Sequence, residues 1–458
     1  MFIQKGELKY MHLKIANDIR VENPNETIKR YCDTKLTLDN PDYLTAKRVG
    51  RYTGNIEKQI KLYIKNANSL IIPYGCLKDV WSLSKGASYE CNFHSFLGNK
   101  MEGSINLYDY QKVALFALKE GKNGILEAPC GSGKTNMGLQ LIKEIGGKAL
   151  WLTHTGKLLE QSRTRCETFF KGDFGEITKG KIQIGRDITF ATVQTMSKID
   201  VEVYKNEFDI VIVDECHHCV GSPTKVMQFY KVITNCNSRY KFGLSATLNR
   251  ADNMISSMFS LIGNVLHTIK QSEVGDKIIT AEHRKVEINL DYKMNDYLDY
   301  DGTLNYMKLI DTLSNSDERN EIIINNVYDN YAIGKKQIIL CHRVKQVEEL
   351  SKRISKFCLV NCLTGKTSLK KRNFDGDVII ATYSLAKEGL DAPFLDVLHL
   401  ATPQKNASTT EQSVGRIERN IDGKEQPICF DYVDVNIDYC NLCYKRRKSI
   451  LLKKSKKK

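Results

Sequence analysis

The sequence lacks long hydrophobic runs, an apolar leader and repetitive segments. No apolar run approaches the roughly 18 to 20 residues needed to cross a bilayer, which excludes a membrane-spanning helix. The opening stretch, MFIQKGELKY, has no signal-peptide core, so we expect a protein of the cytoplasm. Apart from a lysine-rich end there is no low-complexity segment and no short-period repeat, which excludes a short-period repeat architecture.

The composition is that of an ordinary globular protein. Hydrophobic residues make up 41% of the chain and charged residues 27%, as soluble globular proteins use them. At 458 residues the chain is long enough for two or three domains, each with its own core. A single small module is therefore excluded.

The fourteen cysteines fit buried, reduced thiols better than a disulfide framework. Several of them, such as Cys341, Cys358 and Cys429, lie inside strand-like runs. A chain of this size without an export signal has no need of disulfides to hold it together. Redox chemistry is not indicated.

The charge is strongly basic and concentrated at the end of the sequence. The formal net charge is +14, and residues 444–458, YKRRKSILLKKSKKK, contain nine of the basic residues. A basic excess favours a polyanionic partner through phosphate neutralisation and counterion release. The bland alternative is that residues 441–458 form a solvated, frayed tail.

Residues 1–103 have mixed character and predict a small α/β accessory domain. The strand-like run at 70–72 is ended by Pro73 and Gly75, and residues 55–66 have a helix-like pattern. The region also contains a basic group, which either contacts nucleic acid or forms a solvated face; it consists of Lys47, Arg48 and Arg51.

From residue 104 the pattern changes to short apolar runs that alternate with helical stretches, as in parallel strands of βαβ units. The first series is GILEAP, KALWLT, DITFAT, DIVIVDE and KFGLSAT; the second is KQIILCH, DVIIAT, VLHLAT and PICFDY. Two tandem α/β domains are predicted, at 104–284 and 285–440. Residues 285–330 are polar and helix-prone, and suit the approach to the second domain rather than a core strand.

A glycine-rich stretch between a predicted strand and a predicted helix has the pattern of a phosphate-binding loop. It is APCGSGKT, residues 128–135, after GILEA and before NMGLQLIKEI; Ala128 replaces the usual first glycine. In such a loop backbone N–H groups surround phosphates, a lysine reaches the β and γ oxygens, and a hydroxyl holds magnesium. The sequence thus predicts ATP and Mg²⁺ as cofactors. The binding candidates are Gly131, Ser132, Gly133, Lys134 and Thr135.

The stretch VDECHHC, residues 213–219, allows two interpretations. Its acids follow an apolar run and would emerge at the carboxyl end of a buried strand, where α/β sheets bind ligands. Asp214 would then hold the magnesium, and Glu215 would deprotonate the attacking water. Alternatively, Cys216 and Cys219 are zinc ligands, although a structural zinc needs four; CNLC, residues 440–443, offers a second pair.

These motifs, in this order, resemble the superfamily 2 helicases and translocases of the DEAH-like kind. The resemblance covers residues 104–437 and is nearest to the XPB-like and UvsW-like DNA helicases of phages and prophages, which suits a bacterial cell. It implies two RecA-like domains, each a parallel sheet flanked by helices, with ATP at the cleft between them. Gln111, in LYDYQ, matches the element that binds adenine.

Further roles follow from the same resemblance. His217, Ser245 and Thr247 match residues that couple hydrolysis to strand movement, and His218 is expected to be structural. Arg416 and Arg419, with Gln412 in QSVGRIER, match the arginine-finger motif, which stabilises transferring phosphate charge. Ala251 departs from the Arg-Glu-Asp triplet of XPB-like proteins. The residues matching nucleic-acid contacts are Thr153, His154, Thr192, Gln194, Arg250, Arg343, Gly365 and Thr382.

The motifs together predict a nucleic-acid-stimulated ATPase that moves along one strand. Gripping of the backbone predicts little sequence preference and strong salt dependence. The resemblance implies DNA as partner, single-stranded or forked, and 3′-to-5′ movement. An RNA helicase would share every motif, and a restriction-type motor subunit would need a partner to supply a nuclease. A non-enzymatic ATP-switched binding module disagrees with the presence of Glu215 and both arginines. Protein partners are not indicated.

Overall fold

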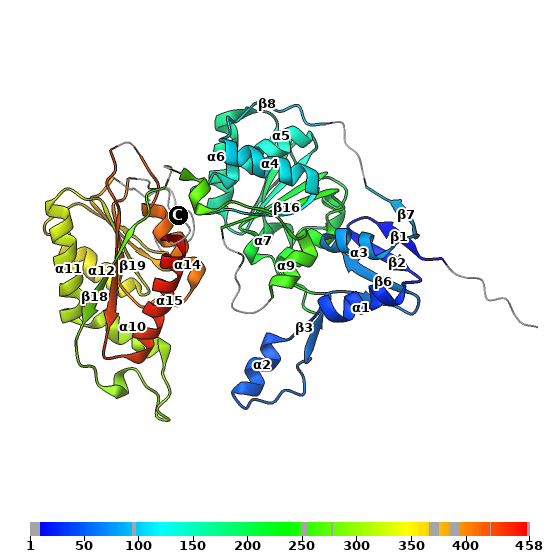
Figure 1. Ribbon diagram of the computed structural model, residues 1–458. Coiled ribbons are helices and arrows are strands. Elements are labelled where there is room, and N and C mark those ends of the chain that lie inside the picture. The colour runs from blue at the N-terminus through cyan, green and yellow to red at the C-terminus, as the bar shows by residue number, and fades with distance from the viewer. Residues whose placement is uncertain are drawn as a thin grey trace, which may run out of the picture. The chain divides into compact units, whose positions relative to one another are not determined.

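The computed structural model describes residues 10–93, 98–246, 248, 254–275, 278–365, 375–384, 392, 394–421 and 423–455. It divides into two compact units. The first unit contains residues 1–129 and 133–269, and the second contains 270–458 together with the short segment 130–132. Each is an α/β structure built on one parallel sheet, as predicted (Figure 1). In the part of the chain described, no helix is long and apolar enough to cross a membrane.

The N-terminal part of the first unit is a small mixed sheet with strand order β5-β6-β2-β1-β7. Its strands are β1 (His12–Ile15), β2 (Asp18–Glu22), β5 (Ile64–Lys65), β6 (Ser69–Pro73) and β7 (Ser88–Cys91). Its helices are α1 (Glu26–Lys35) and α3 (Leu77–Leu83). The predicted run at 70–72 is confirmed as part of β6, whereas the predicted helix at 55–66 is wrong.

Residues 55–66 contain two short strands, β4 (Gln59–Lys61) and β5, together with turns rather than a helix, and exposed and buried positions alternate along β4. Gln59 and Lys61 are exposed on β4, and Ile60 between them is buried. β4 pairs with β3 (Thr37–Asp39) in a two-stranded ribbon that carries the short helix α2 (Pro41–Arg48). Figure 1 shows α2 beyond the end of this ribbon, away from the main N-terminal sheet.

The N-terminal sheet is joined to the rest of the first unit by a shared core. Val220 and Met254 pack with the N-terminal apolar residues, and the Tyr74 hydroxyl donates to the Arg239 carbonyl at 2.7 Å. The buried Lys241 Nζ donates to the Asn17 carbonyl at 3.4 Å. The predicted boundary at 103/104 is crossed by these contacts and stays a prediction.

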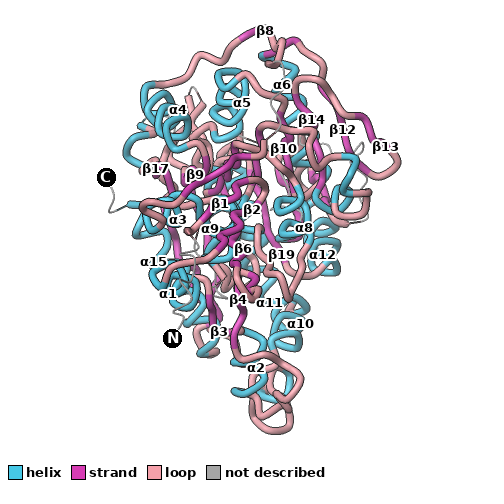
Figure 2. The backbone as a smooth tube through the Cα atoms, turned by 90° about the vertical axis from the view of Figure 1, so that its right-hand side faces the viewer, coloured by secondary structure: helices cyan, strands magenta, loops and turns pink. Residues whose placement is uncertain are grey.

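The large sheet of the first unit has the strand order β13-β12-β14-β10-β15-β16-β9-β17 and is parallel except for β13. Figure 2 shows β10, β14, β12 and β13 side by side toward one edge. All five apolar runs of the first series form strands in it. The strands are β9 (Asn123–Glu127), β10 (Ala149–Thr153), β12 (Phe174–Thr178), β13 (Lys181–Gln183), β14 (Ile188–Thr192), β15 (Ile210–Asp214), β16 (Tyr240–Ser245) and β17 (Val265–Thr268).

Helices cover both faces of this sheet. One face is covered by α4 (Asp109–Gly121), α5 (Lys134–Ile145) and α6 (Gly156–Phe169), and the other by α7 (Val193–Met196), α8 (Gln228–Asn235) and α9 (Ile255–Ile262) (Figure 1). Local chemistry fixes their ends: Thr155 Oγ1 accepts from Leu158 N to cap α6, and Gly146 ends α5 at φ +81°. A two-residue pair, β8 (Glu102–Gly103) with β11 (Phe170–Lys171), lies outside the sheet.

The second unit contains a fully parallel sheet with strand order β18-β23-β22-β19-β21-β20. All four predicted runs of the second series are confirmed as strands. The strands are β18 (Glu282–Ile288), β19 (Gln337–Cys341), β20 (Val360–Leu363), β21 (Val378–Thr382), β22 (Val397–Leu400) and β23 (Ile428–Asp434). The helices on its two faces are α11 (Asp317–Ala332) with α12 (Val344–Ile354), and α14 (Ala407–Ile417) with α15 (Asp438–Ser455).

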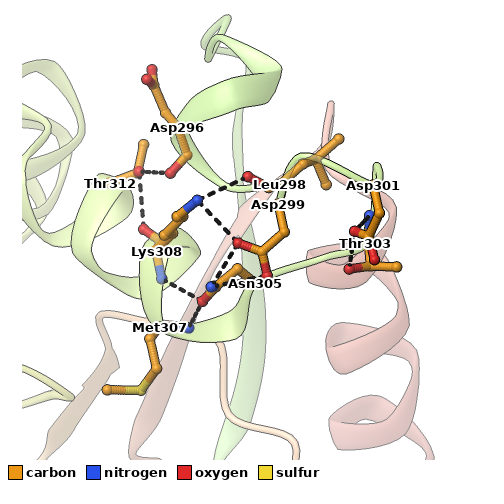
Figure 3. Close-up of polar contacts among 9 residues, drawn as sticks. All are labelled: Asp296, Leu298, Asp299, Asp301, Thr303, Asn305, Met307, Lys308 and Thr312. Carbon is orange, nitrogen blue, oxygen red and sulfur yellow. Dashed lines mark hydrogen bonds and ion pairs between the residues drawn. The ribbon is translucent and has the colours of Figure 1, made fainter. Parts of the chain in front are cut away.

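The segment before this sheet differs from the sequence expectation at one point. Residues 285–288, expected in an approach segment, belong to β18, an edge strand whose charged residues are largely exposed. The predicted boundary at 284/285 therefore falls inside a strand. The following loop is tied by its own polar groups (Figure 3): Asn305 Nδ2 donates to Asp299 Oδ1 at 3.0 Å, and Lys308 Nζ pairs with the same oxygen. Asn305 Oδ1 also caps α10 (Tyr306–Asn315).

The basic end of the sequence is helical through Ser455 rather than a frayed tail. α15 packs on α14 and β23, and Arg447 within it is only 1% exposed. The Arg447 guanidinium donates from Nε and Nη2 to the two oxygens of Asp431, at 2.8 and 2.6 Å. A count of charges alone suggests a solvated tail, because it cannot show that Arg447 is buried in an ion pair.

Candidate functional site

Most of the first unit's candidate residues come together where five parallel strands end. The strands β14, β10, β15, β16 and β9 are consecutive neighbours in the sheet. Their register aligns the ends: Thr153 lies opposite Thr192, and Ser245 lies opposite Glu127, the last residue before the phosphate loop. Asp214 ends the strand between them. The sheet therefore places separate sequence motifs along one edge.

The phosphate loop connects β9 to α5 in the conformation its glycines allow. Gly131 and Gly133 have φ values of +82° and +83°, in the left-handed region that favours glycine. Lys134 is the first residue of α5, and its Nζ donates to the carbonyls of Ala128 at 3.0 Å and Pro129 at 3.3 Å. The ammonium group thus lies over the loop itself, at the N-terminus of a helix.

Gln111 packs directly against this loop. Its Oε1 accepts from Tyr108 N at 3.0 Å at the start of α4, and the side chain is buried. A Cβ added at Gly133 would lie 2.4 Å from Gln111 Nε2 and would displace that side chain, and the φ of +83° also favours glycine there. The Tyr108 and Tyr110 rings stack with centroids 6.0 Å apart beside it. Tyr108 was not predicted as a site residue, although the LYDYQ stretch could have indicated a second ring.

The pKa values of the adjacent acids Asp214 and Glu215 are shifted in opposite directions. Burial, together with the neighbouring Glu215 carboxylate, raises the pKa of Asp214 above its ordinary value. Burial would also raise the pKa of Glu215, but the hydrogen bond from His217 and the charge of Lys134 outweigh it and lower the pKa. Glu215 has the unusual backbone φ of +51°, which a non-glycine residue rarely adopts. The pair therefore keeps one strongly ionised carboxylate at its outer end.

Two histidines follow the acids in the short 3₁₀ helix Cys216–His218. His217 Nδ1 lies 3.2 Å from Glu215 Oε2 and 3.1 Å from Ser245 Oγ. The predicted coupling pair His217 and Ser245 is therefore in contact. His218 is exposed, and its ring stacks on that of His154 with centroids 4.3 Å apart. Sequence reasoning did not connect His218 with His154, because they lie on different motifs.

The predicted nucleic-acid residues of the first unit differ in accessibility. Thr153 is fully buried, and its hydroxyl donates to the Thr155 carbonyl at 3.1 Å. Thr192 is nearly buried and bonds to the Thr195 hydroxyl. Gln194 is exposed, and its Nε2 donates to the His154 carbonyl at 2.7 Å. The threonines shape the loops, whereas Gln194 can reach a partner.

The predicted residues of the second unit lie at several places in it. Arg343 follows β19, and its Nε donates to Asp311 Oδ1 at 2.6 Å; Gly365 follows β20 and is exposed, and Thr382 ends β21. The arginine-finger candidates lie on or after α14, and they are Gln412, Arg416 and Arg419. Two predicted residues, Thr247 and Arg250, lie outside the described residues.

The cysteines of the zinc alternative have the surroundings of core residues. Cys216 and Cys219 are buried in the apolar core of the first unit, and burial raises the pKa of the Cys216 thiol well above its ordinary value. Cys440 and Cys443 are buried in the second unit. In the described parts of both units, no three His, Cys, Asp or Glu side chains are grouped so that they could hold a metal ion. All fourteen cysteines are free thiols, and ten are buried.

Comparison with known proteins places these motifs in a family. Residues 104–250 match the family described as type III restriction enzyme, res subunit. An ATP-dependent RNA helicase, L396 of Acanthamoeba polyphaga mimivirus, is 28% identical over 82% of this chain and 73% of its own length. Helicase D10 of Escherichia phage T5 is 27% identical over 68% of this chain and 67% of its own.

Two further similarities agree with these. The DNA 3′-5′ translocase XPB2 of Sulfurisphaera tokodaii is 24% identical over 70% of this chain and 80% of its own length. This chain is a superfamily 2 helicase. It belongs with the XPB-like members and is an enzyme of the ATPase/helicase class. The fold agrees with that of Saccharomyces cerevisiae Dbp5, with a TM-score of 0.52 at 15% identity, over 76% of this chain and 88% of that one.

Proposed function

We propose that this helicase is an ATP-driven motor that moves along one strand of DNA. The observation that carries the proposal is the single sheet edge of the first unit, where the phosphate loop, the acid pair and the nucleic-acid candidates end neighbouring strands. Because these three groups of residues follow strands of one sheet, we expect a structural change at the nucleotide to shift the loops that contact the nucleic acid. The relative named as a DNA 3′-5′ translocase supports DNA as the substrate, and the relative from an Escherichia phage supports action in a bacterial cytoplasm.

The residues of the loop fit ATP with Mg²⁺. Positive φ at Gly131 and Gly133 suits a loop whose N–H groups surround phosphates, and Lys134 Nζ would exchange its two carbonyl partners for phosphate oxygens. Thr135 would hold the magnesium directly and Asp214 would hold it through water. The bound metal would lower the cost of the buried Asp214 charge and neutralise phosphate charge. Gln111 beside the loop would hydrogen-bond the base, and Ser132 would line the phosphates.

Glu215 is the proposed general base. Its lowered pKa keeps the carboxylate ionised at neutral pH, and His217 holds one oxygen in place. Ser245 bonds the same imidazole nitrogen, so the motif at the end of β16 touches the base through one residue. Arg416 and Arg419 are proposed to stabilise the charge that develops during hydrolysis, with Gln412 supporting them.

Nucleic acid is proposed to contact the loops after β10 and β14 through His154 and Gln194, with Thr153 and Thr192 holding those loops. Arg343, Gly365 and Thr382 are the corresponding candidates of the second unit. The α2 ribbon is a further candidate, because Tyr52 is 80% exposed on it among exposed cations. Aromatic rings and cations side by side suit a nucleic-acid strand. The cations are Lys47, Arg48 and Arg51.

Two alternative functions are each supported by a specific observation. The mimivirus relative is named as an RNA helicase, which favours RNA. The matched family is that of a restriction subunit, which favours a motor within a restriction complex whose nuclease a partner would supply.

The test is phosphate release by the full chain with Mg²⁺ and ATP, alone and with matched single-stranded DNA, RNA or duplex DNA. We expect single-stranded DNA to stimulate turnover most, and the stimulation to fall steeply as salt rises. Directional movement is then measured as displacement of streptavidin from either end of the DNA strand. Lys134→Ala, which should not turn over ATP, is the control for contaminating ATPase. Stimulation by RNA alone, or by neither, would contradict the DNA proposal.

A further inference from the structure

Side chains at the ends of three neighbouring strands form a continuous line in the first unit. Gln194 Nε2 donates to the His154 carbonyl at 2.7 Å, and the His154 ring stacks on that of His218 at 4.3 Å, with 28° between the planes. The His218 ring lies 4.2 Å from the His217 ring. His217 Nδ1 then lies 3.2 Å from Glu215 Oε2. The line runs from an exposed amide to the proposed base.

The sheet holds both ends of this line in fixed positions. Gln194 follows β14, His154 follows β10, and both His218 and His217 follow β15; these strands are consecutive neighbours. The backbone under each ring is anchored, since β10, β14 and β15 are buried along their whole length. Only the side chains and the loops above the sheet are left to move, so a shift of the His154 loop reaches the acids through the stacked rings.

The stack is not required by the core. His218 is exposed, so removal of its imidazole creates no buried cavity. The turn that carries it is held instead by Cys216 and Cys219, which are fully buried on either side. A stacked aromatic pair contributes to stability only modestly beyond the area that it buries. An exposed ring placed between a strand-contacting loop and the acid pair therefore needs another explanation.

We propose that His218 is a positioning residue that transmits the binding of nucleic acid at His154 and Gln194 to the Glu215 carboxylate. This inference rests on the proposed function, in which Glu215 is the base and the loop at His154 contacts the strand. Nucleic acid that fixes the His154 loop fixes the stack, and the stack limits the rotation of the His217 ring. His217 then holds Glu215 in the orientation that activates water.

The test compares His218→Ala with His218→Phe, which keeps a flat ring against His154. His12→Ala, a truncation of another first-unit histidine, is the matched control. Turnover is measured with and without saturating single-stranded DNA, and DNA affinity by fluorescence anisotropy. We expect His218→Ala to lower the ratio of stimulated to unstimulated turnover about fivefold with little change in DNA affinity. His218→Phe should keep most of the ratio, and His12→Ala all of it.

A second set of variants tests whether the two rings act through one contact. The variants are His154→Ala, His218→Ala and the double variant His154→Ala/His218→Ala. If the two rings act through one contact, the double variant should lose no more stimulation than the single variant that loses more. Additive losses would overturn the inference. So would an unchanged ratio in His218→Ala, or an equal fall of both turnovers, which would mark a structural role. A wild-type protein that DNA and RNA both fail to stimulate would instead contradict the proposed function.

Discussion

Two buried aspartates, one in each unit, have pKa values that are shifted in opposite directions. Asp214 ends a central strand of the first sheet, and burial beside Glu215 raises its pKa. Asp431 lies on β23 of the second sheet; burial alone would raise its pKa, but bonds from His283 and Arg447 lower it. Both carboxylates are almost inaccessible to solvent. The difference is that a guanidinium permanently bonds one of them.

This contrast separates a structural charge from a functional one. A buried ion pair with two N–H···O bonds holds α15 to the second sheet, and it needs nothing more. A buried acid whose pKa is raised is unfavourable until a cation arrives. The first unit has such an acid at the sheet edge from which the phosphate loop leaves, and this is where we propose that a metal-bound nucleotide binds.

The largest effect should come from the proposed base. Glu215→Gln keeps the size of the side chain but removes its proton-accepting oxygen, so stimulated turnover should fall about a thousandfold. ATP and DNA should still bind, because neither depends on this carboxylate. Phosphate release and nucleotide binding by a fluorescent analogue measure the two separately. A variant that hydrolyses ATP at the normal rate would show that the functional acid lies elsewhere.

The structural pair should respond in stability rather than chemistry. Arg447→Ala leaves Asp431 buried without its guanidinium, and should lower the free energy of unfolding of the second unit by about 3 kcal/mol. Hydrogen exchange of peptides from β23 and α15 follows this unit during urea unfolding. The double variant Arg447→Met/Asp431→Leu should recover most of the loss. A single variant as stable as the wild type would mean that the pair contributes nothing.

The sequence indicates the central strands well. Runs such as DIVIVDE and KQIILCH form strands because strands buried on both faces need continuous apolar residues. The carboxyl-edge rule predicts that Asp214 and Glu215 lie at the edge where α/β sheets bind ligands, whereas Ser245 was identified only through the family resemblance. The order of the strands, which brings β14 and β10 beside β15, cannot be predicted from any short segment of the sequence.

The misses share one cause, which is context from distant residues. β18 reads EHRKVEI and is stabilised by pairing with β23 rather than by its own apolar content. Arg447 looks like part of a solvated tail until Asp431, on another element, is found beside it. The contact of His218 with His154 joins residues from two motifs. Pair contacts across the fold escape an inspection of single segments.

His399 is a third buried titratable group, and its effect on the stability of the second unit depends on pH. It is fully buried in the second sheet, with Nδ1 2.9 Å from the Tyr432 hydroxyl and Nε2 2.9 Å from Gln337 Oε1. Burial lowers the pKa of His399 to about 3. Below about pH 6.5 the unfolded chain binds a proton that the folded state does not, so stability falls as pH falls toward 3. Above pH 6.5 this histidine has no further effect.

The expected loss from His399 is about 2 kcal/mol between pH 6.5 and pH 5. Urea unfolding of the second unit at these two values, in the wild type and in His399→Gln, isolates the contribution. The variant should lose less stability on acidification. Equal losses in both proteins would mean that His399 is protonated in the folded state.

The smallest effect has the opposite sign and tests the first unit. The folded-state pKa of Asp214 is raised, so its stability contribution is lost as pH rises above the ordinary value near 4. At pH 7, without nucleotide, Asp214→Asn should therefore stabilise the first unit by about 1 kcal/mol, although it should abolish turnover. The amide oxygen can still accept from Glu215 N, as the carboxylate does at 3.0 Å.

Tryptophan fluorescence can measure this change, since both tryptophans, Trp81 and Trp151, lie in the first unit. The stability gained by Asp214→Asn should shrink as pH falls and approach zero near pH 3, where the wild-type carboxyl is protonated in the folded state and largely so in the unfolded chain. Asp431→Asn, the matched change in the second unit, should destabilise that unit at pH 7, because it removes the charge that Arg447 neutralises. If both substitutions destabilised their units, Asp214 would be a paired structural acid like Asp431. The edge of the first sheet would then no longer be distinguished as a site prepared for a cation.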